Sequence, residues 1–474
     1  MELIRDQSII AGYLTDASNT KGHAEALIRP RNAEEVAEIV TQCQQSALPL
    51  TITAFRTSTT GGPVPAGGWL MSTEHLNRIL GPDHVEGGII LGEHQNTLEQ
   101  ESLHFPPDPT SRHECSIGAS IACNASGARS FRYGPTRPWI RGLEVVLPTG
   151  EICTITRDTP LPDQWPAPSW SPPPVKHAAG YHPTHNLLDL MIGQEGTLGV
   201  ITKARLRLTQ RPLGRLSMII FFRNLDATLE FVAAARQHAT RPSGNLDDEN
   251  QLLQTSDLDG LNPSAIEFFD HNALGMVRAR VPGVPDAAHS ALFIEIEHDG
   301  EPPIESWWEA LMEHDALLDD IIVAEDDAGR AKLQAVRHAI PAGINEQVVQ
   351  NGMPKISTDF SVPNSALPAM MEAYEKVPLT HITFGHIGDN HLHVNMLPTT
   401  PEELTQAKGI YRDLAHQAIS LGGTVSAEHG IGKIKKELLA DLVGKDVLTQ
   451  FQDLKTKADP NWVLGRGTLL AGPV

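Results

Sequence analysis

The sequence predicts an α+β fold with two main parts, and three observations lead to it. The chain has 474 residues, more than one hydrophobic core usually supports. Residues 1–210 combine strand and helix patterns with glycine-rich loops, whereas residues 211–401 alternate apolar strands with amphipathic helices. The second pattern is typical of helices packed on a mainly antiparallel sheet. A largely helical segment, 402–474, completes the chain.

The elements of the first part follow from apolar periodicity and from turn residues. In order, we expect a strand at 24–30, a helix at 32–48, a strand at 49–55, a loop of small and hydroxyl-bearing residues at 56–68, an irregular proline-rich surface segment at 159–174, a helix at 187–193, and a turn and strand at 194–208. Arg211 and Pro212 begin a new pattern, so the boundary is placed near residue 210.

The second part contains short apolar runs and longer amphipathic ones. The strands are expected at 217–222, 291–297, 381–387 and 391–397, and the helices at 226–239, 307–318 and 365–375.

The amino-acid composition restricts the kinds of molecule that the protein can bind. The formal net charge of -21 predicts an acidic surface, which disfavours nucleic acid and anionic lipid but allows a local basic pocket for an acid substrate. No apolar run approaches the roughly 20 residues of a membrane-spanning helix, and the N-terminus lacks a signal-peptide pattern. We expect a cytoplasmic protein, either free or peripheral to a membrane.

The four cysteines show no paired spacing. Cys43, Cys115, Cys123 and Cys153 form no CxxC motif, so neither an iron-sulfur cluster nor a structural zinc site is indicated. If electrons leave this protein for a cluster, that cluster belongs to another chain.

Three histidines cluster in the segment GHIGDNHLHVN at 385–395. His391 and His393 share one face of an extended strand, and the turn at 388–390 folds His386 back beside them. Converging imidazoles suit a divalent metal, and Glu428 in AEHGIGK offers a further ligand. Spacing alone leaves two alternatives open: a metal site, or hydrogen-bonded structural histidines beside an acidic helix start.

Two glycine-rich stretches, 104–134 and 192–202, let backbone N–H groups approach phosphate or flavin oxygens closely. Neither a GxGxxG motif after the first strand nor a GxxxxGK[ST] motif is present, which disfavours Rossmann and P-loop folds. Arg337 and Lys355 could pair a substrate carboxylate, although a solvated helix arginine is the commoner case.

Eight segments, in order, resemble the FAD-linked oxidases of the vanillyl-alcohol oxidase superfamily, in the branch that holds D-lactate dehydrogenases, glycolate oxidase flavin subunits and D-2-hydroxyglutarate dehydrogenases. The segments are ALIRPRNAEEVAEIV, FPPDP, SIGASIACNASGARSFRYG, GLEVVLPTGE, IGQEGTLGVIT, TDFSVP, GHIGDNHLHVN and SAEHGIGK, and together they cover nearly the whole chain.

The resemblance implies an FAD-binding domain of the PCMH type, formed by residues 1–210 and completed by 402–474, with an antiparallel-sheet cap domain at 211–401 between them. It implies that a divalent metal (zinc, manganese or iron) is bound by His386, His393 and Glu428, that His429 is the catalytic base, and that Arg337 and Asn395 contact substrate, with Lys355 nearby. The FAD contacts that it implies are Thr57, Ser58, Thr60, Gly61, Asp108, Ser116, Ile117, Gly118, Ser120, Asn124, Gly127, Tyr133, Gly134, Glu195, Gly196, Gly199 and Ile201.

Three departures from the family pattern refine these expectations. The pyrophosphate loop is RTSTTGG here, with bulkier residues in place of some glycines. It contains no histidine, so we expect non-covalent FAD. D-2-hydroxyglutarate members have a lysine six residues before the proline of the SVP segment, where this chain has Ser357, and this favours a smaller acid.

The predicted activity is therefore oxidation of a small D-2-hydroxy acid, D-lactate or glycolate, to the 2-oxo acid by hydride transfer to flavin N5. Two alternatives stay open: a flavin subunit that passes electrons to an iron-sulfur partner, and a D-2-hydroxyglutarate dehydrogenase. A flavin oxidase of another alcohol or aldehyde is a further rival.

Overall fold

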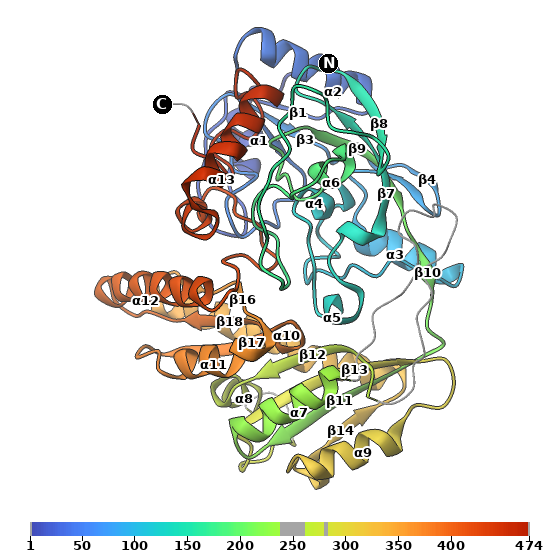
Figure 1. Cartoon of the computed structure of the whole chain (residues 1–474), viewed down its shortest axis with the longest axis vertical. Coiled ribbons are helices and arrows are strands. Elements are labelled where there is room, and N and C mark those ends of the chain that lie inside the picture. The colour runs from blue at the N-terminus through green and yellow to red at the C-terminus, as the bar shows by residue number, and fades with distance from the viewer. Residues whose placement is uncertain (1, 238–260, 279–282, 473–474) are drawn as a thin grey trace.

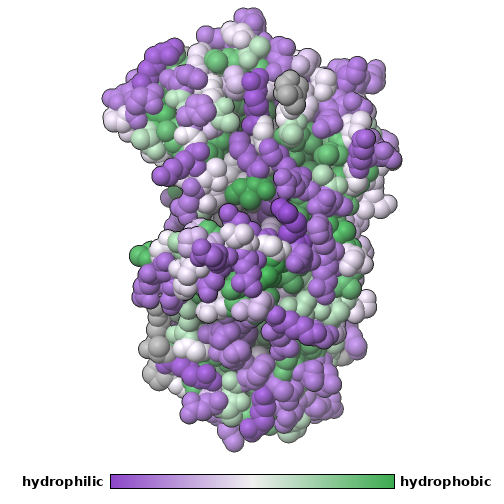
Figure 2. Space-filling model, turned by 90° about the vertical axis from the view of Figure 1, so that its left-hand side faces the viewer, coloured by the Kyte–Doolittle hydropathy of each residue, from purple (hydrophilic) through white to green (hydrophobic). Residues whose placement is uncertain are grey.

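The computed structural model describes residues 2–237, 261–278 and 283–472. It confirms the predicted α+β class. Figure 1 shows two bodies: an N-terminal body, which contains strands β1 to β9 and the C-terminal helix α13, and a large-sheet body, which contains β11 to β18 with their helices. In the space-filling view the surface is hollowed where the two bodies meet (Figure 2). The division of the chain at residues 210 and 401 stays a prediction.

The first sheet of the N-terminal body is parallel, in the order β1 (Ala26–Ile28), β3 (Trp69–Ser72), β2 (Leu50–Thr53). Helix α2 (Ala33–Gln45) begins at Asn32, whose side chain accepts a hydrogen bond from the N–H of Glu35 and so caps the helix. The apolar face of α2, including Val36 and Ile39, is fully buried. The predicted strand, helix, strand unit is confirmed.

The second sheet is antiparallel, in the order β4 (Ile79–Gly81), β5 (His84–Glu86), β9 (Val200–Leu206), β7 (Ile140–Val146), β8 (Ile152–Thr156). Val146 and Val200 share one hydrophobic core with α2 and with Val463 from the end of the chain. Leu464 also forms a parallel bridge with Leu50, so the chain returns to its first sheet.

Short elements and loops connect these sheets. They are α1 (Gln7–Ile10), η1 (Ala11–Tyr13), α3 (Leu91–Gln100), β6 (Leu103–His104), α4 (Ile117–Ala122), α5 (Ser130–Tyr133), η2 (Arg137–Trp139), α6 (Leu187–Met191) and β10 (Thr209–Gln210), which pairs with β6. The segment predicted to be irregular, 159–174, contains no helix. It is mostly at the surface, although the ring of Trp165 is buried.

The large sheet is antiparallel throughout. Its order is β14 (Ile322–Ala324), β11 (Gly214–Phe222), β13 (Ser290–His298), β12 (Pro263–Phe269), β17 (His381–His386), β18 (His391–Met396), β15 (Ile356–Ser357), with β16 (Phe360–Ser361) also paired to β18. Strand β12 was not among the strands predicted.

Helices cover both faces of this sheet. Helices α7 (Leu225–Gln237) and α9 (Ile304–Glu313) pack on one face, and α8 (His271–Arg278) and α10 (Asp327–Asn351) on the other. The last two residues predicted for the first of these helices, 238 and 239, lie outside the described residues.

The end of the chain is helical, with one long interruption. Helices α11 (Leu367–Glu375), α12 (Pro401–Ser420) and α13 (Lys436–Ala458) are present, with short 3-10 turns at η3 (Leu318–Asp320), η4 (Asn364–Ala366) and η5 (Ile387–Asp389). Helix α13 begins at Lys436. The non-helical segment 421–435 between α12 and α13 carries the AEHGIGK motif.

Buried ion pairs join the two bodies. Arg129, just before α5, forms a two-point contact with Glu295 on β13 and lies 3.8 Å from Asp108. Tyr133 donates its hydroxyl hydrogen to Glu297 on the same strand. Burial alone would favour a neutral acid, but Arg129 lowers the pKa of Glu295 to about 2. The contact between the bodies therefore contains paired charges.

Replacing Arg129 by methionine should destabilise the protein, because it leaves a buried carboxylate without its partner. We expect the free energy of unfolding to fall by about 3–5 kcal/mol in chemical denaturation followed by circular dichroism. The control is Lys376→Met, which removes an exposed pair with Glu372 and should have no measurable effect. Equal stability of the two variants would contradict the role given to Arg129.

Candidate functional site

The β17–β18 hairpin brings the three clustered histidines together. His386 pairs directly across the hairpin with His391, and His393 lies two residues further along the same face. Their ring centroids are 4.6 to 5.9 Å apart. Asn390 closes the turn at φ 52°, a conformation that asparagine tolerates. The predicted convergence of the three rings is thus present in the structure.

The turn is held from outside the hairpin. Arg236 on α7 donates to the carbonyls of Ile387 and Gly388 and to the side chain of Asn390. A Cβ at Gly388 would lie 2.8 Å from the ring of Phe131 on α5, so only glycine allows this close approach. The hairpin tip is therefore fixed by both bodies.

Glu428 arrives from segment 421–435 and faces all three histidines. Its carboxylate oxygens lie 3.3 Å from His386 Nε2, 3.5 Å from His393 Nε2 and 3.8 Å from His391 Nδ1. One donor atom from each of these four residues lies within 4.8 Å of the other three. Three imidazoles and a carboxylate at this spacing suit a divalent ion such as zinc.

The far sides of two of these rings are anchored. His386 Nδ1 lies 2.5 Å from the carboxylate of Glu267, which also pairs with Arg337 at 3.0 Å. His393 Nδ1 lies 2.9 Å from the carbonyl oxygen of Thr358. Each anchor accepts the Nδ1 proton and turns Nε2 toward Glu428, which is the arrangement that metal-binding histidines adopt.

Asp359 is the hub of the site. Its carboxylate accepts hydrogen bonds from Lys435 at 2.5 Å, from Ser426 at 2.9 Å, and from the backbone N–H groups of Glu428 and His429 at 3.2 Å. Although burial favours the neutral acid, the neighbouring side chains of His429 and Lys435 hold the pKa of Asp359 well below its usual range. Asp359 is therefore a fixed anion in this site.

His429 is the most exposed of the site histidines, with 32% of its side chain accessible. Its ring stacks on His393 at a centroid distance of 5.4 Å. Nδ1 lies 3.4 Å from Asp359 and Nε2 lies 3.3 Å from Glu428. This is the geometry of a base oriented by a carboxylate.

The predicted substrate residues lie on or beside the same sheet face. Asn395 continues the row formed by His391 and His393, and it pairs across the sheet with Ser357. Lys355 lies two positions before Ser357, is half-buried, and forms no ion pair with another described residue. Burial lowers its pKa. The structure thus brings Arg337 and Asn395 to the histidines and leaves Lys355 at the rim of the row.

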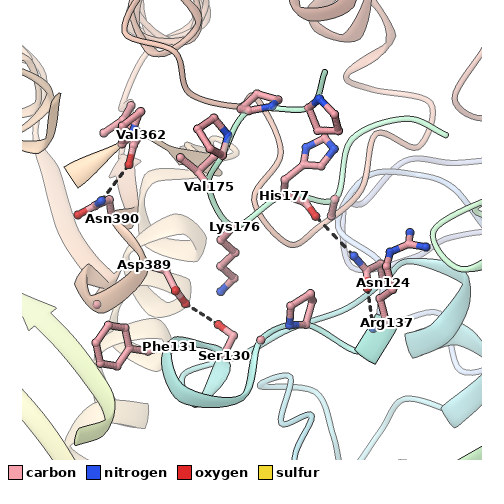
Figure 3. A pocket seen from close by; sticks show the side chains of 18 of the residues that line it. Asn124, Ser130, Phe131, Arg137, Val175, Lys176, His177, Val362, Asp389 and Asn390 are labelled. Carbon is pink, nitrogen blue, oxygen red and sulfur yellow. Dashed lines mark hydrogen bonds between the residues drawn. The ribbon is translucent and has the colours of Figure 1, made fainter. Parts of the chain in front are cut away.

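Lys176 was not predicted and reaches the centre of the site. It follows the proline-rich segment, is buried, and donates a hydrogen bond of 2.8 Å to Glu428. Its side chain extends toward Asp389 and Ser130 in the wall of a cavity of about 610 Å³ (Figure 3). A lysine after a run of prolines gives no sequence signal for such a contact.

Glu267 and Asp359 were also missed as site residues. Glu267 is an acid inside the apolar strand β12, and a buried charge in such a strand usually has a specific partner. Asp359 lies in the TDFSVP segment, one of the eight segments that resemble the family pattern. These two signals were present in the sequence.

The loop predicted to bind pyrophosphate contacts the segment that carries His429. Thr60 donates to the carbonyl of His429 and accepts from the N–H of Lys433. Gly61 donates its N–H to Asp16. Within the described parts of the chain, the N–H groups of Thr57, Ser58, Thr59 and Gly62 donate to no protein acceptor. Such amides can bind a diphosphate.

The remaining predicted FAD residues fall into two groups. Glu195 and Gly196 lie beside the loop at 57–62 and the segment 430–432, and the carboxylate of Glu195 accepts from Ile431 and Gly432. Gly199 and Ile201 follow them into β9. The second group surrounds α4 and α5 and comprises Asp108, Ser116, Ile117, Gly118, Ser120, Asn124, Gly127, Tyr133 and Gly134.

Most residues of this second group have small side chains or contact the backbone of other residues. Such residues leave room for a flat ligand. Gly127 lies against the backbone of Asp108, and Ser116 caps α4. Asn124 bonds to the backbone of Arg137 and of His177. Tyr133 differs, because its hydroxyl is already bonded to Glu297 and its ring packs on Trp139.

Comparison with known proteins gives the same overall assignment. A model described as an FAD binding domain matches residues 24–156, and one described as the C-terminal domain of FAD linked oxidases matches residues 245–469. These matches confirm the predicted FAD cofactor. How FAD is attached stays a prediction.

Similar proteins match over most of their length. A D-2-hydroxyglutarate dehydrogenase of Xanthomonas citri is 31% identical over 94% of this chain and 89% of its own. Glycolate oxidase subunit GlcD of Bacillus subtilis is 28% identical over 94% and 89%, and a D-lactate dehydrogenase of Anaerostipes hadrus is 28% identical over 95% and 90%.

A solved structure of alkyldihydroxyacetonephosphate synthase superposes with a TM-score of 0.68 at 15% identity, over 98% of this chain and 82% of that one. At this identity the likeness concerns the fold alone. None of the described helices is both long and apolar enough to cross a bilayer.

Glu195 is expected to make the stability of the folded protein depend on pH. Burial raises its pKa from 4.5 to about 7, despite the two N–H groups that stabilise its charge. The folded protein therefore holds a proton here that the unfolded chain releases between about pH 4.5 and pH 7. The stabilisation from this group is present at low pH and is lost as pH rises through about 7.

We expect Glu195→Gln to flatten the dependence of the melting temperature on pH between 5 and 8, measured without added FAD. The exposed Glu93→Gln serves as the matched control and should keep the wild-type slope. An unchanged slope in Glu195→Gln would mean that its carboxylate stays ionised in the folded protein.

Proposed function

The chain belongs to the family of FAD-linked oxidases, and from that premise we propose that it oxidises a small D-2-hydroxy acid to the 2-oxo acid. D-lactate and glycolate are the preferred substrates in this proposal. The observation that carries it is the Asp359–His429 pair, set beside Glu428 and two histidines whose Nδ1 atoms are anchored.

His429 takes the substrate hydroxyl proton at Nε2. Asp359 lies beside Nδ1, so it holds the proton of the neutral ring there and leaves a lone pair at Nε2. The same carboxylate stabilises the imidazolium that forms. FAD, when bound, supplies the acceptor for the hydride that leaves C2.

His386, His393 and Glu428 would hold a divalent ion, which supplies a positive charge that lowers the pKa of the substrate hydroxyl. These residues fit the ion because both imidazoles are anchored at Nδ1 and directed by Nε2 toward the carboxylate.

The substrate carboxylate is bound by Arg337 in this proposal. Glu267 holds the guanidinium at Nε, which leaves its outer edge to form a two-point contact with an acid. Asn395, on the same row as His393, contributes a further polar group on this face of the sheet. Binding at two points fixes C2 relative to His429.

The register of the sheet favours a small acid as the substrate. Ser357, with its short side chain, lies opposite Asn395. Lys355 lies two residues earlier in the chain, so its Cα is about 6.6 Å from that of Ser357. A second carboxylate near Asn395 would therefore meet a hydroxyl group where a cation is needed. A D-2-hydroxyglutarate dehydrogenase remains the second candidate, since a relative of that name is 31% identical.

The electron acceptor is a separate molecule in this proposal. The four cysteines are unpaired, with Cys43 and Cys115 buried, and among the described residues they form no cluster site. An iron-sulfur protein is one such acceptor in this proposal. Relatives named GlcD are subunits of glycolate oxidase, so a second chain as partner agrees with their names.

The test is the anaerobic visible spectrum of the FAD-loaded protein, before and after D-lactate, glycolate, D-2-hydroxyglutarate and the L-enantiomers of the two chiral acids, with and without added Zn²⁺ or Mn²⁺. We expect glycolate or D-lactate to bleach the flavin band in a metal-dependent way. Bleaching by D-2-hydroxyglutarate alone would select the second candidate, and no bleaching by any of these acids would refute the proposal.

His429→Asn should slow this bleaching by at least about 100-fold, because the proton acceptor is lost, while FAD binding stays unchanged. His416→Asn, an exposed histidine on α12, is the control and should react at the wild-type rate. Normal bleaching by His429→Asn would assign the proton transfer to another group.

Lys176 provides a separate test of the metal. Its ammonium group contacts Glu428, so it repels a divalent ion held by the same carboxylate. Lys176→Met should therefore tighten Zn²⁺ binding roughly 10- to 100-fold, measured by competition with a chromophoric chelator. Lys203→Met, which removes a pair with Glu144 in the N-terminal body, is the control. Weaker Zn²⁺ binding in Lys176→Met would mean that Lys176 orients Glu428 for the ion.

A further inference from the structure

We propose that His391 is a fourth protein ligand of the metal, so that the ion is bound by three imidazoles and one carboxylate. This inference rests on the proposed function, because it concerns the same ion as His386, His393 and Glu428. It assigns to His391 a role that the sequence prediction did not give it.

The position of the ring in the sheet is the first argument. His391 is the direct cross-strand partner of His386 and stands on the same face as His393. Its ring is 4.6 Å from that of His393 and 5.3 Å from that of His386. The hairpin that directs the two predicted ligands toward Glu428 therefore directs this third imidazole to the same point.

Distances to Glu428 are the second argument. His391 Nδ1 lies 3.8 Å from Oε2 of Glu428, which is too long for a hydrogen bond. Two ligands of a tetrahedral ion with bonds of about 2.1 Å are separated by about 3.4 Å. The separations of 3.3 and 3.8 Å to Oε2 and of 3.5 Å to Oε1 are close to that value, so all three rings can share one ion with the carboxylate of Glu428.

One nitrogen of the His391 ring has no hydrogen-bond partner in the described parts of the chain. His391 is fully buried, and its Nδ1 makes no hydrogen bond to a described residue. Its Nε2 lies 2.9 Å from Oδ1 of Asp359, which accepts but does not donate, so the ring proton belongs at Nε2. Nδ1 is left with a lone pair that points toward Glu428. A buried polar atom without a partner is destabilising, and an ion would remove that cost.

The usual alternative is a structural histidine held by Asp359. That contact accounts for Nε2 but leaves Nδ1 without a partner. His391 also repeats the arrangement of its neighbours, in which an oxygen anchors one nitrogen and the other faces Glu428. Ligation accounts for both nitrogens.

Three nitrogens and one oxygen select borderline ions. Such a donor set favours Zn²⁺ and Co²⁺ over Mn²⁺ and Mg²⁺, which prefer oxygen. These four residues would hold the ion, which would still supply a positive charge to the substrate hydroxyl.

The experiment measures metal binding directly, without turnover. The metal-free protein and its His391→Asn, His386→Asn and His416→Asn variants are titrated with Zn²⁺ against a chromophoric chelator, and with Co²⁺ while the visible d–d bands are recorded. We expect His391→Asn and His386→Asn each to weaken Zn²⁺ binding on the order of 100-fold. Both should also weaken the four-coordinate Co²⁺ bands, whereas His416→Asn should change nothing.

If His386→Asn loses affinity and His391→Asn keeps both its affinity and its Co²⁺ bands, this inference is wrong and the predicted three-residue site stands. If neither variant changes binding, the proposed metal centre itself fails. X-ray absorption of the Zn²⁺-loaded wild type gives an answer that does not depend on how the variants fold. Three imidazoles in the first coordination sphere support the inference, and two overturn it.

Discussion

The buried carboxylate of Asp359 is the constraint on which the site depends. It lies beside β16 in the large-sheet body, yet it accepts the N–H groups of Glu428 and His429, the hydroxyl of Ser426 and the ammonium of Lys435, all from the segment that precedes α13. One ionised group thus fixes where the C-terminal segment meets the sheet. The same carboxylate lies beside His391 and His429, so the residue that positions the backbone also orients two of the rings.

Much of the site was predictable because its residues occur in two compact motifs. Alternation in HLHVN placed His391 and His393 on one face, and the turn residues Gly388 and Asn390 placed His386 beside them. The convergence of Glu428 on that face came from the family resemblance, since spacing left the metal and structural readings open. The strand, helix, strand start of the chain was predictable for a similar reason, because α2 has a clear apolar face and a capping asparagine.

The rest depends on contacts between distant segments, about which local periodicity carries no information. Glu267 is on a strand that was not predicted, because PSAIEFF is short, contains a proline and does not alternate. Lys176 ends an irregular segment for which only a surface position was expected. Glu195 was predicted as an FAD contact, but its two backbone donors come from residues more than 230 positions later. These three residues could be placed only once the tertiary structure was known.

The pairing of buried charges explains how so many ionisable groups can lie in one interior. Glu428 contacts Lys176, Glu267 contacts Arg337, and Asp359 contacts Lys435, so each anion has a cation from the chain itself. An unpaired buried charge would be costly, and this arrangement lets the protein fold without help from an ion. An ion that binds at Glu428 must then compete with Lys176 for the same oxygen. In the proposed metal site, affinity would therefore depend on that competition as well as on the number of imidazole ligands, and the segment after the prolines, which supplies Lys176, would be part of that site.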